Sequence, residues 1–283
     1  MRYQFMRFPE GKAKAVTFSY DDGLKQDIHL AKLFAEYGMK ATFNLNSELF
    51  RQGSGLSKQE VEDYLLQPGH EIAVHGSFHR AEGTLRPIEG IREVLECRME
   101  LEQRYSRIIR GMAYPDFGIR QFYNGATYAG VKTYLQELDI AYARTLGGDN
   151  DSFMLPTDWH QWMPTAHHNN PQIMMYIDTF LKLDISEEII KKQYPRLFYI
   201  WGHSSEFDRH NNWDHIENIC KAFAGAQDVW YATNIEICDY VQAYQSLAYS
   251  ADGKMVYNPT LKTIWFVADG KLHTIHSGET LHI

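Results

Sequence analysis

The sequence predicts an α/β fold: a deformed (β/α)7-8 barrel with a small C-terminal all-β appendage. Over roughly residues 13–249, short apolar segments rich in β-branched and aromatic residues alternate with amphipathic segments, as in a parallel sheet whose strands are joined by helices. Chemically reactive residues follow several of the apolar segments, as they do at a barrel mouth. A doubly wound open sheet is the competing fold. We expect a barrel domain at 1–249 and an appendage at 250–283.

The alternating segments set the predicted order of elements. The first strand is followed by an amphipathic helix that stops at Gly38, and a later helix opens with Pro87, a favoured residue for a first helical turn. The predicted strands are 13–20, 40–46, 70–74, 108–114, 140–144, 197–201 and 229–233. The predicted helices are 26–37, 58–66, 87–105, 126–138, 172–183, 213–223 and 236–249. Residues 147–170 are predicted to form a long irregular loop that could cover the barrel mouth.

The appendage is predicted from a change in pattern after residue 249. Two Asp-Gly pairs, Asp252-Gly253 and Asp269-Gly270, fall between short alternating apolar runs, which is typical of β-hairpins. Its predicted strands are 255–257, 263–267, 272–276 and 280–283. The appendage could bind substrate or seal a dimer, but we favour simple packing against the barrel.

Composition limits the classes of function. The net charge of −8 argues against a nucleic-acid partner. Aromatic residues make up 14% of the chain, which suits sugar-stacking surfaces as well as a large core. The three widely spaced cysteines form neither a disulfide framework nor a CxxC motif, and we see no apolar leader and no stretch long enough to span a membrane. We therefore expect a cytoplasmic protein with no membrane partner and a possible homo-oligomer.

Two adjacent carboxylates are the most informative feature. Asp21 and Asp22 directly follow an apolar, β-rich run and precede Gly23. Their mutual repulsion is costly unless a cation or a shared proton relieves it. An Asp-Asp-Gly sequence is usually only a turn, so the pair alone does not establish a site.

Two histidines spaced four apart, His75 and His79, follow a predicted strand. We expect them on one side of a helical turn, where both imidazoles could grip one metal ion, although a solvated helix face is the simpler explanation of such a pair. One Asp and two His form a three-ligand site with an open position, as in catalytic zinc centres. The second Asp would then be free to act as a base.

Other candidate site residues also fall at predicted strand ends, namely Pro115, Arg144 and His203. In an α/β barrel all these ends face one mouth. Each could instead be an ordinary loop residue, and for Arg144 a loop salt bridge is the alternative.

With these motifs in place, about residues 10–245 resemble the metal-dependent polysaccharide deacetylases of carbohydrate esterase family 4, which have a nodulation-B-like deformed barrel. The family's Thr-Phe-Asp-Asp-Gly motif appears as Thr17 to Gly23, stretched by two residues. The resemblance implies that Asp21 is the general base, that Asp22, His75 and His79 are the metal ligands, and that His203, after the strand ending Ile200-Trp201-Gly202, is the general acid. It further implies that Asp158 orients the catalytic imidazole and that Trp159 walls the acetyl pocket.

The third family motif departs from the pattern. In place of Arg-x-Pro-Tyr-Gly the chain has Ala113-Tyr114-Pro115-Asp116-Phe117-Gly118, so alanine stands at the arginine position and the turn is one residue longer. We expect Tyr114, Pro115 and Asp116 to contact the substrate, with a backbone N–H near Asp116 or Phe117 facing the oxyanion. Arg144, at the end of the neighbouring predicted strand, is our candidate to replace the missing arginine.

The predicted reaction is removal of an N- or O-linked acetyl group from a carbohydrate. A divalent metal, for which Zn is favoured and Co, Ni or Fe are possible, would polarise the carbonyl and lower the pKa of bound water. We expect the substrate to be an acetylated oligosaccharide or small glycoconjugate. The alternatives are a non-catalytic carbohydrate-binding protein on a degenerate barrel and a metal phosphoesterase, whose sites usually hold more than one metal.

Overall fold

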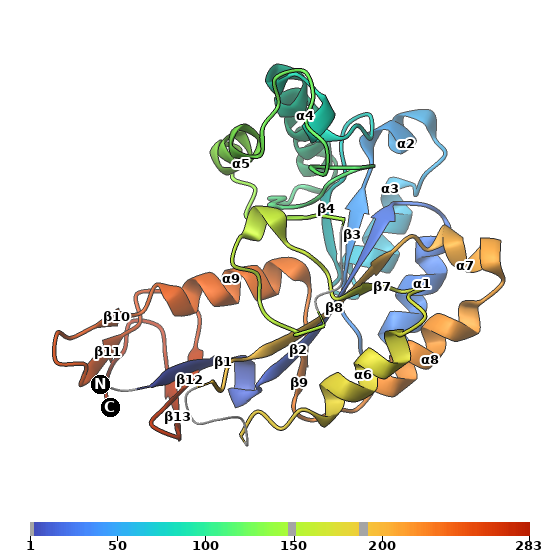
Figure 1. Ribbon diagram of the computed structural model, residues 1–283. Coiled ribbons are helices and arrows are strands. Elements are labelled where there is room, and N and C mark those ends of the chain that lie inside the picture. Colours follow the sequence, from blue (N-terminus) through green and yellow to red (C-terminus); the bar gives the residue numbers. More distant parts are fainter. Residues whose placement is uncertain (1–2, 147–150, 187–191) are drawn as a thin grey trace.

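The computed structural model describes residues 3–146, 151–186 and 192–283, and its centre is a curled, parallel eight-stranded sheet with helices on its outer side (Figure 1). The strand order is β6-β5-β4-β3-β2-β8-β7, with β9 paired to β2 as well. Around the ring the strands follow one another as in the chain, from β2 to β6 and then from β7 to β8, which pairs with β2 again. In a doubly wound sheet the first strand lies in the middle and later strands are added on both sides of it. The predicted deformed barrel is confirmed, and the open doubly wound sheet is wrong.

The barrel strands are short, and all of their pairings are parallel. They are β2 (Lys14–Asp22), β3 (Ala41–Leu45), β4 (Glu71–Val74), β5 (Gly111–Ala113), β6 (Tyr142–Arg144), β7 (Ala166–His167), β8 (Arg196–Gly202) and β9 (Val229–Tyr231). The ring has a seam between β6 and β7. At this seam Trp162 forms an isolated parallel β-bridge with Arg144 of β6, and the backbone N–H of Thr165 donates to the Tyr199 carbonyl of β8. Residues 162–167 therefore cross the seam from β6 to β8.

Strand β2 lies at the middle of the sheet and is shared by three neighbours. It pairs with β8 from Lys14 to Tyr20 along one edge. Its other edge is divided, because β9 pairs with its first residues and β3 pairs from Phe18 to Asp22. The carboxyl end of β2, which carries the paired aspartates, is therefore held between β3 and β8 at the centre of the barrel mouth.

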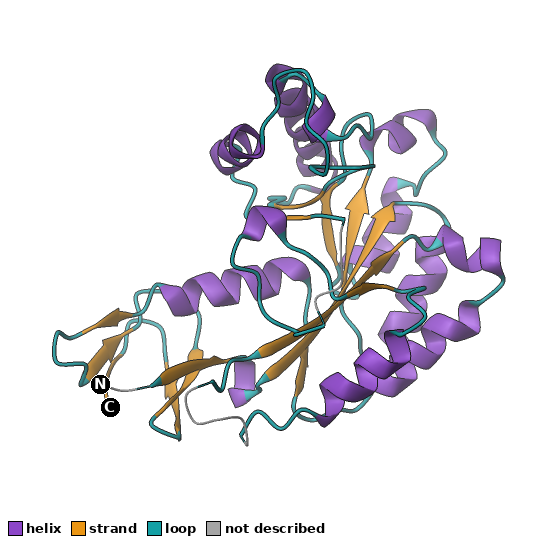
Figure 2. Ribbon diagram, viewed as in Figure 1, coloured by secondary structure: helices purple, strands orange, loops and turns teal. Residues whose placement is uncertain are grey.

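The helices follow the predicted spacing closely, and Figure 2 shows them on the outer side of the strands. The described helices are α1 (Gln26–Glu36), α2 (Ser47–Gln52), α3 (Lys58–Glu60), α4 (Pro87–Tyr105), α5 (Tyr128–Glu137), α6 (Ile173–Lys182), α7 (Ser205–His210), α8 (Trp213–Phe223) and α9 (Asn234–Gln245), with a π-helical turn η2 (Val61–Leu66) and 3-10 turns η1 (Pro9–Gly11), η3 (Glu82–Thr84) and η4 (Trp159–Gln161). Sequence patterns missed α2 and α7, which are too short to show a helical period. None of the helices in the described ranges has both the length and the apolar character needed to cross a lipid bilayer.

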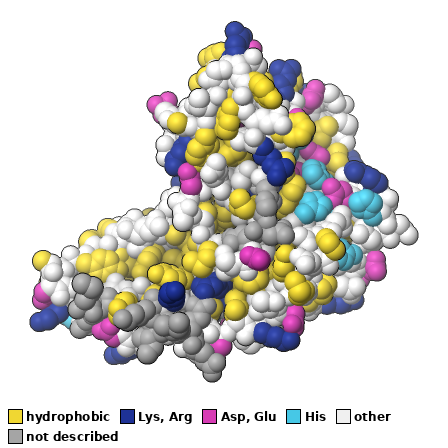
Figure 3. Space-filling model, viewed as in Figure 1, with side chains coloured by type: hydrophobic (Ala, Val, Ile, Leu, Met, Phe, Trp, Pro, Cys, Tyr) yellow, Lys and Arg dark blue, Asp and Glu magenta, His cyan; other side chains and the backbone are white. Residues whose placement is uncertain are grey.

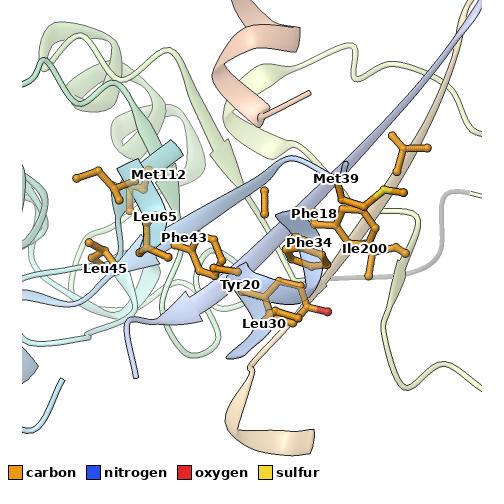
Figure 4. Packing of buried hydrophobic residues seen from close by; sticks show 14 of the residues in the cluster. Phe18, Tyr20, Leu30, Phe34, Met39, Phe43, Leu45, Leu65, Met112 and Ile200 are labelled. Atoms are coloured by element: carbon orange, nitrogen blue, oxygen red, sulfur yellow. The ribbon is translucent and has the colours of Figure 1, made fainter. Parts of the chain in front are cut away.

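The main core lies between the sheet and the helices. Figure 4 shows Phe18, Tyr20 and Ile200 from the strands packed near Phe34 of α1. The Phe18 and Phe34 rings lie 4.7 Å apart between centroids. A β2 strand buried along nearly its whole length fits a sheet covered by helices, and it explains the continuous apolar run in the sequence.

Two small antiparallel sheets form the appendage. One contains β1 (Gln4–Arg7), β12 (Ile264–Ala268) and β13 (Lys271–Ile275), and the other contains β10 (Ala248–Tyr249), β11 (Met255–Tyr257) and β14 (Thr280–His282). The β1 strand was not predicted, and the predicted helix 236–249 ends at Gln245 and continues into β10. Segments from both sides of position 249 thus contribute to the appendage sheets. A second apolar cluster joins β12 and α9 to the barrel, so the appendage packs on the barrel.

Candidate active site

The mouth of the barrel collects the reactive side chains that the sequence places at strand ends. Asp21 and Asp22 come from β2, Arg144 from β6, His75 from the residue after β4, and His203 from the residue after β8. Figure 3 shows histidine and acidic side chains gathered on one face of the molecule. The parallel pairing of the strands brings residues up to 182 positions apart in the chain into one site.

Asp22, His75 and His79 form a group whose ligand atoms all lie within 4.8 Å of one another. The Oδ1 atom of Asp22 lies 3.8 Å from His75 Nε2 and 3.5 Å from His79 Nε2. The opposite ring nitrogens are held in place: His75 Nδ1 lies 2.9 Å from the Ala113 carbonyl, and His79 Nδ1 lies 3.5 Å from Asp116 Oδ1. Such outer contacts fix the imidazole so that Nε2 faces a metal.

The loop that carries the two histidines is not helical, so the predicted helical turn is wrong. Gly76 and His79 have positive φ angles of 84° and 55°, which fold the segment back on itself. Glu93 of α4 holds this loop, because its carboxylate accepts hydrogen bonds from the backbone N–H groups of Phe78 and Arg80 at 2.6 and 3.1 Å. The two imidazoles converge through this anchored loop and not through helical spacing.

Three residues of the site have strained backbone conformations. Asp22, His79 and Asp116 have φ angles of 82°, 55° and 48°, in the region that residues other than glycine rarely adopt. Such strain persists only where the surrounding structure enforces it, and it concentrates at functional sites. Asp22 and His79 are two of the three predicted metal ligands, and Asp116 contacts His79.

Asp21 is fully enclosed and is held by several partners. Its Oδ1 accepts a hydrogen bond from Asn44 Nδ2 at 2.8 Å, and its Oδ2 lies 2.5 Å from Arg144 Nη2. The same Oδ2 is 3.9 Å from both His75 Nε2 and His203 Nε2. Burial would raise the pKa of Asp21, but Arg144, the two histidines and Asn44 together lower it below its ordinary value. The carboxylate is therefore ionised and able to accept a proton.

Arg144 reaches Asp21 from the strand next to the one that carries the expected arginine position. Ala113 of β5 and Arg144 of β6 are direct register partners, so their side chains lie on the same face of the sheet. Arg144 is fully buried, and its guanidinium stacks 4.5 Å from the centre of the Trp201 ring. The structure places the arginine where the sequence analysis predicted a replacement. Its predicted role in the reaction stays a prediction.

His203 lies between two carboxylates. Its Nε2 faces Asp21, and its Nδ1 lies 3.2 Å from Glu206 Oε1. Burial would lower the pKa of His203, but Glu206 and the negative charges of Asp21 and Asp22 outweigh burial and raise the pKa to about 9. An imidazole that keeps its proton at neutral pH is suited to act as an acid.

The structure does not bring Asp158 to His203. The Asp158 carboxylate instead accepts hydrogen bonds from Tyr128, Lys132 and the backbone of His160, where it caps the short η4 turn. Glu206 of α7 holds the imidazole in its place, because α7 begins two residues after His203 and turns Glu206 back toward it. The predicted orienting role of Asp158 is therefore corrected to Glu206, which sequence reasoning missed although it stands three residues after His203.

The aromatic wall is also corrected. Trp159 is half-buried and packs against Trp162 in the second apolar cluster, and Trp162 is buried beside β6. The described part of the predicted 147–170 loop therefore packs along the barrel, while residues 147–150 lie outside the described residues. Trp201 is the tryptophan that contacts site residues: its ring lies against Arg144 and 6.1 Å from the His203 ring.

The turn after β5 is split between core and site. Tyr114 is buried, and its hydroxyl donates to the His160 carbonyl, so its side chain does not face the mouth as a substrate contact would. Pro115 is buried beneath the histidine loop, close to Gly76. Asp116 is exposed and adjoins His79, and Phe117 is 60% exposed. The exposed part of this turn, Asp116 and Phe117, is what the structure leaves available to a substrate.

The donor set fits a divalent metal. One carboxylate oxygen and two neutral imidazole nitrogens are typical ligands of a catalytic zinc ion and also suit related transition metals. Burial lowers the pKa of His75, so its ring is neutral and its lone pair is available. Asp22, His75 and His79 would hold the ion, with Asp116 and the Ala113 carbonyl behind the two imidazoles.

Comparisons with known proteins point to one family. Residues 9–133 match the family model described as polysaccharide deacetylase, and a search of curated proteins finds no match. A protein described as a polysaccharide deacetylase, from Mycobacterium smegmatis, aligns with a TM-score of 0.51 and 14% identity over 85% of this chain and 94% of that chain, which indicates the same fold.

Two further structures resemble parts of the chain more weakly. Deacetylase PplD of Streptococcus pyogenes, solved with acetate, has a TM-score of 0.41 and 18% identity over 46% of this chain and 55% of that one, so the chain spans about half the length of that relative. BA3943 of Bacillus anthracis, described as a pseudoenzyme of carbohydrate esterase family 4, has a TM-score of 0.48 and 13% identity over 83% of this chain and 68% of that one. The family match includes Asp21, Asp22, His75 and His79, whereas His203 lies beyond it.

Proposed function

Because residues 9–133 match the polysaccharide deacetylase family model, we propose that the protein is a metal-dependent hydrolase that removes acetyl groups from a carbohydrate. A single observation carries the proposal: the Asp21 carboxylate and the His203 imidazole stand 3.9 Å apart beside the three-ligand group. Two titratable groups whose environments push their pKa values in opposite directions make a base and an acid.

Each residue of the site has its own role in the proposed reaction. Asp22, His75 and His79 would hold a divalent ion, whose Lewis acidity would polarise the acetyl carbonyl and make water easier to deprotonate. Asp21 takes the proton of the attacking water through the carboxylate that Arg144 and Asn44 hold. His203 donates its Nε2 proton to the departing amine or alkoxide, while Glu206 fixes the ring from Nδ1. The backbone N–H of Asp116 is our candidate to stabilise the oxyanion.

The experiment is acetate release from a panel of N- and O-acetylated oligosaccharides, with and without chelator. The wild type should release acetate, lose activity on chelation and regain it with Zn²⁺ or Co²⁺. Asp21→Asn should retain the metal and lose about 10²–10⁴ in rate. Asp158→Asn is the matched control and should keep most of the activity, because the Asp158 carboxylate bonds Tyr128, Lys132 and the His160 backbone and not His203.

Full activity in metal-free protein would contradict the metal dependence. Carbohydrate binding by the wild type without acetate release from any member of the panel would favour a non-catalytic binding protein. If Asp21→Asn lost its metal as readily as Asp22→Asn, the roles of the two aspartates would have to be exchanged.

A small soluble substrate in the cytoplasm is a further part of the proposal. Cys97, Cys220 and Cys238 are buried free thiols, as suits a reducing compartment. A chain-length series of acetylated oligomers tests the substrate. Activity that falls as the oligomer lengthens supports a pocket for short ligands, and activity that climbs up to insoluble polymer refutes it.

A further inference from the structure

A second group of possible metal ligands lies on the side of His203 that faces away from Asp21. The Glu206 carboxylate has imidazoles around it: its Oε2 lies 3.2 Å from His167 Nε2 and 3.0 Å from His168 Nε2, and its Oε1 lies 3.2 Å from His203 Nδ1. His167, His203 and Glu206 meet the same distance test as Asp22, His75 and His79, since their ligand atoms all lie within 4.8 Å of one another. Both groups offer one carboxylate and two imidazoles, which is a donor set that zinc accepts.

The strand register builds this second group. His167 of β7 pairs with Trp201 of β8, and His203 follows two residues later, so the two imidazoles approach each other across neighbouring strand ends. His168 is fully buried against the rings of Tyr20 and Phe207, and its Nε2 faces the Glu206 carboxylate. The three ligand side chains are only partly buried, with exposures of 27% for His167, 30% for His203 and 15% for Glu206, so an ion can reach them from solvent.

We propose that His167, His203 and Glu206 bind a second divalent metal ion, and that this ion inhibits the enzyme. His203 links the second group to the proposed base, because its Nε2 faces Asp21 and its Nδ1 faces Glu206. An ion on Nδ1 takes the place of the proton there and leaves the ring as a neutral imidazole with its Nε2 proton. A neutral imidazole is a much weaker acid than an imidazolium, so protonation of the leaving group slows. The inhibition rests on the proposed function, whereas the metal site does not.

Metal binding tests the site without any assay of activity. Protein stripped with chelator is dialysed against Zn²⁺, and the bound metal is counted by elemental analysis. The wild type should bind two ions per chain, because two ligand groups are present. His167→Gln, which keeps an N–H donor for Glu206 but loses the imidazole lone pair, should bind one. His210→Gln, on the short helix α7 that also carries Glu206, is the matched control and should bind two.

Two more variants separate the sites. Asp22→Asn should lose the first ion and keep the second, and Glu206→Gln should do the reverse. If His167→Gln and Glu206→Gln both bind as many ions as the wild type, with a circular dichroism spectrum that confirms folding, the second site does not exist. A wild type that binds a single ion at every Zn²⁺ concentration up to millimolar overturns the proposal too.

Inhibition is measured as acetate release against rising Zn²⁺. The wild type should be activated by the first equivalent and then lose about 10²-fold in rate as the second site fills. His167→Gln should be activated in the same way and should resist the excess. Equal inhibition of both proteins refutes the inhibitory role. Two ions bound with no acetate release under any condition would overturn the proposed function and leave the second site standing.

Discussion

Replacing Arg144 by alanine should disable the base without touching the metal ligands. The Arg144 and Asp21 side chains are 0% and 3% exposed, and their charged atoms are 2.5 Å apart. Removing one partner of a buried ion pair typically costs about 3–5 kcal/mol, because the other charge is left unpaired. We expect Arg144→Ala to lose a similar amount of free energy of unfolding at neutral pH.

The kinetic effect follows from the pKa of Asp21. Among the neighbours that lower this pKa against the effect of burial, Arg144 has the largest influence, so its removal raises the pKa. Since the base must be ionised, the acidic limb of the pH profile of kcat/KM moves to higher pH. Because Asn44 and the two histidines remain, we expect a loss of about 10²-fold at neutral pH, at the lower end of the range for general bases. Part of the activity should return as the pH rises.

The assay is acetate release over a pH series, with metal content and urea unfolding measured on the same samples. Arg110→Ala is the matched control, because Arg110 forms a half-exposed ion pair with Asp239 and should change neither limb. The double variant Arg144→Ala with Ala113→Arg places the guanidinium on the register partner and should recover activity. An Arg144→Ala protein with wild-type kcat/KM and an unmoved acidic limb would refute the reasoning.

The other predictions concern groups around the base. Asp116→Asn should weaken metal binding about 10–100-fold by loosening His79, measured by competition with a chelator, and unchanged affinity would remove Asp116 from the site. Glu206→Gln should lower the pKa of His203 from about 9, so the basic limb of kcat/KM moves to lower pH, whereas Asp158→Asn should leave it in place; a shift only in the second variant would restore Asp158 as the orienting residue. Burial raises the pKa of Glu82 well above its ordinary value, so its contribution to the free energy of unfolding falls as the pH rises above the unfolded value. Glu82→Gln should therefore gain stability relative to the wild type between about pH 5 and about pH 8 in urea unfolding, and a constant difference between the two proteins would contradict this.

Local patterns in the sequence predict most of the secondary structure. The helices 87–105 and 213–223 were predicted at the bounds that the structure has, because Pro87 marks one start and apolar residues repeat at helical spacing in both. The histidine loop was not predicted because Gly76 and His79 take left-handed conformations, and the loop is held by Glu93 of α4, which lies 13 and 15 positions from the residues it bonds. A pattern of neighbouring residues cannot show that a distant glutamate holds this loop.

The sequence by itself determined the alternation of strands and helices, the paired aspartates, the two histidines and the histidine after β8, because each depends on a short run of residues and on the rule that parallel strand ends meet at one edge. Only the tertiary structure decided which residues stand behind them. Arg144 reaches Asp21 because β6 lies beside β5 in register, Glu206 holds His203 because α7 turns back over the mouth, and Asp158 faces α5 instead. Such contacts depend on strand register and side-chain reach between distant segments, and both are set when the whole sheet closes and its core packs.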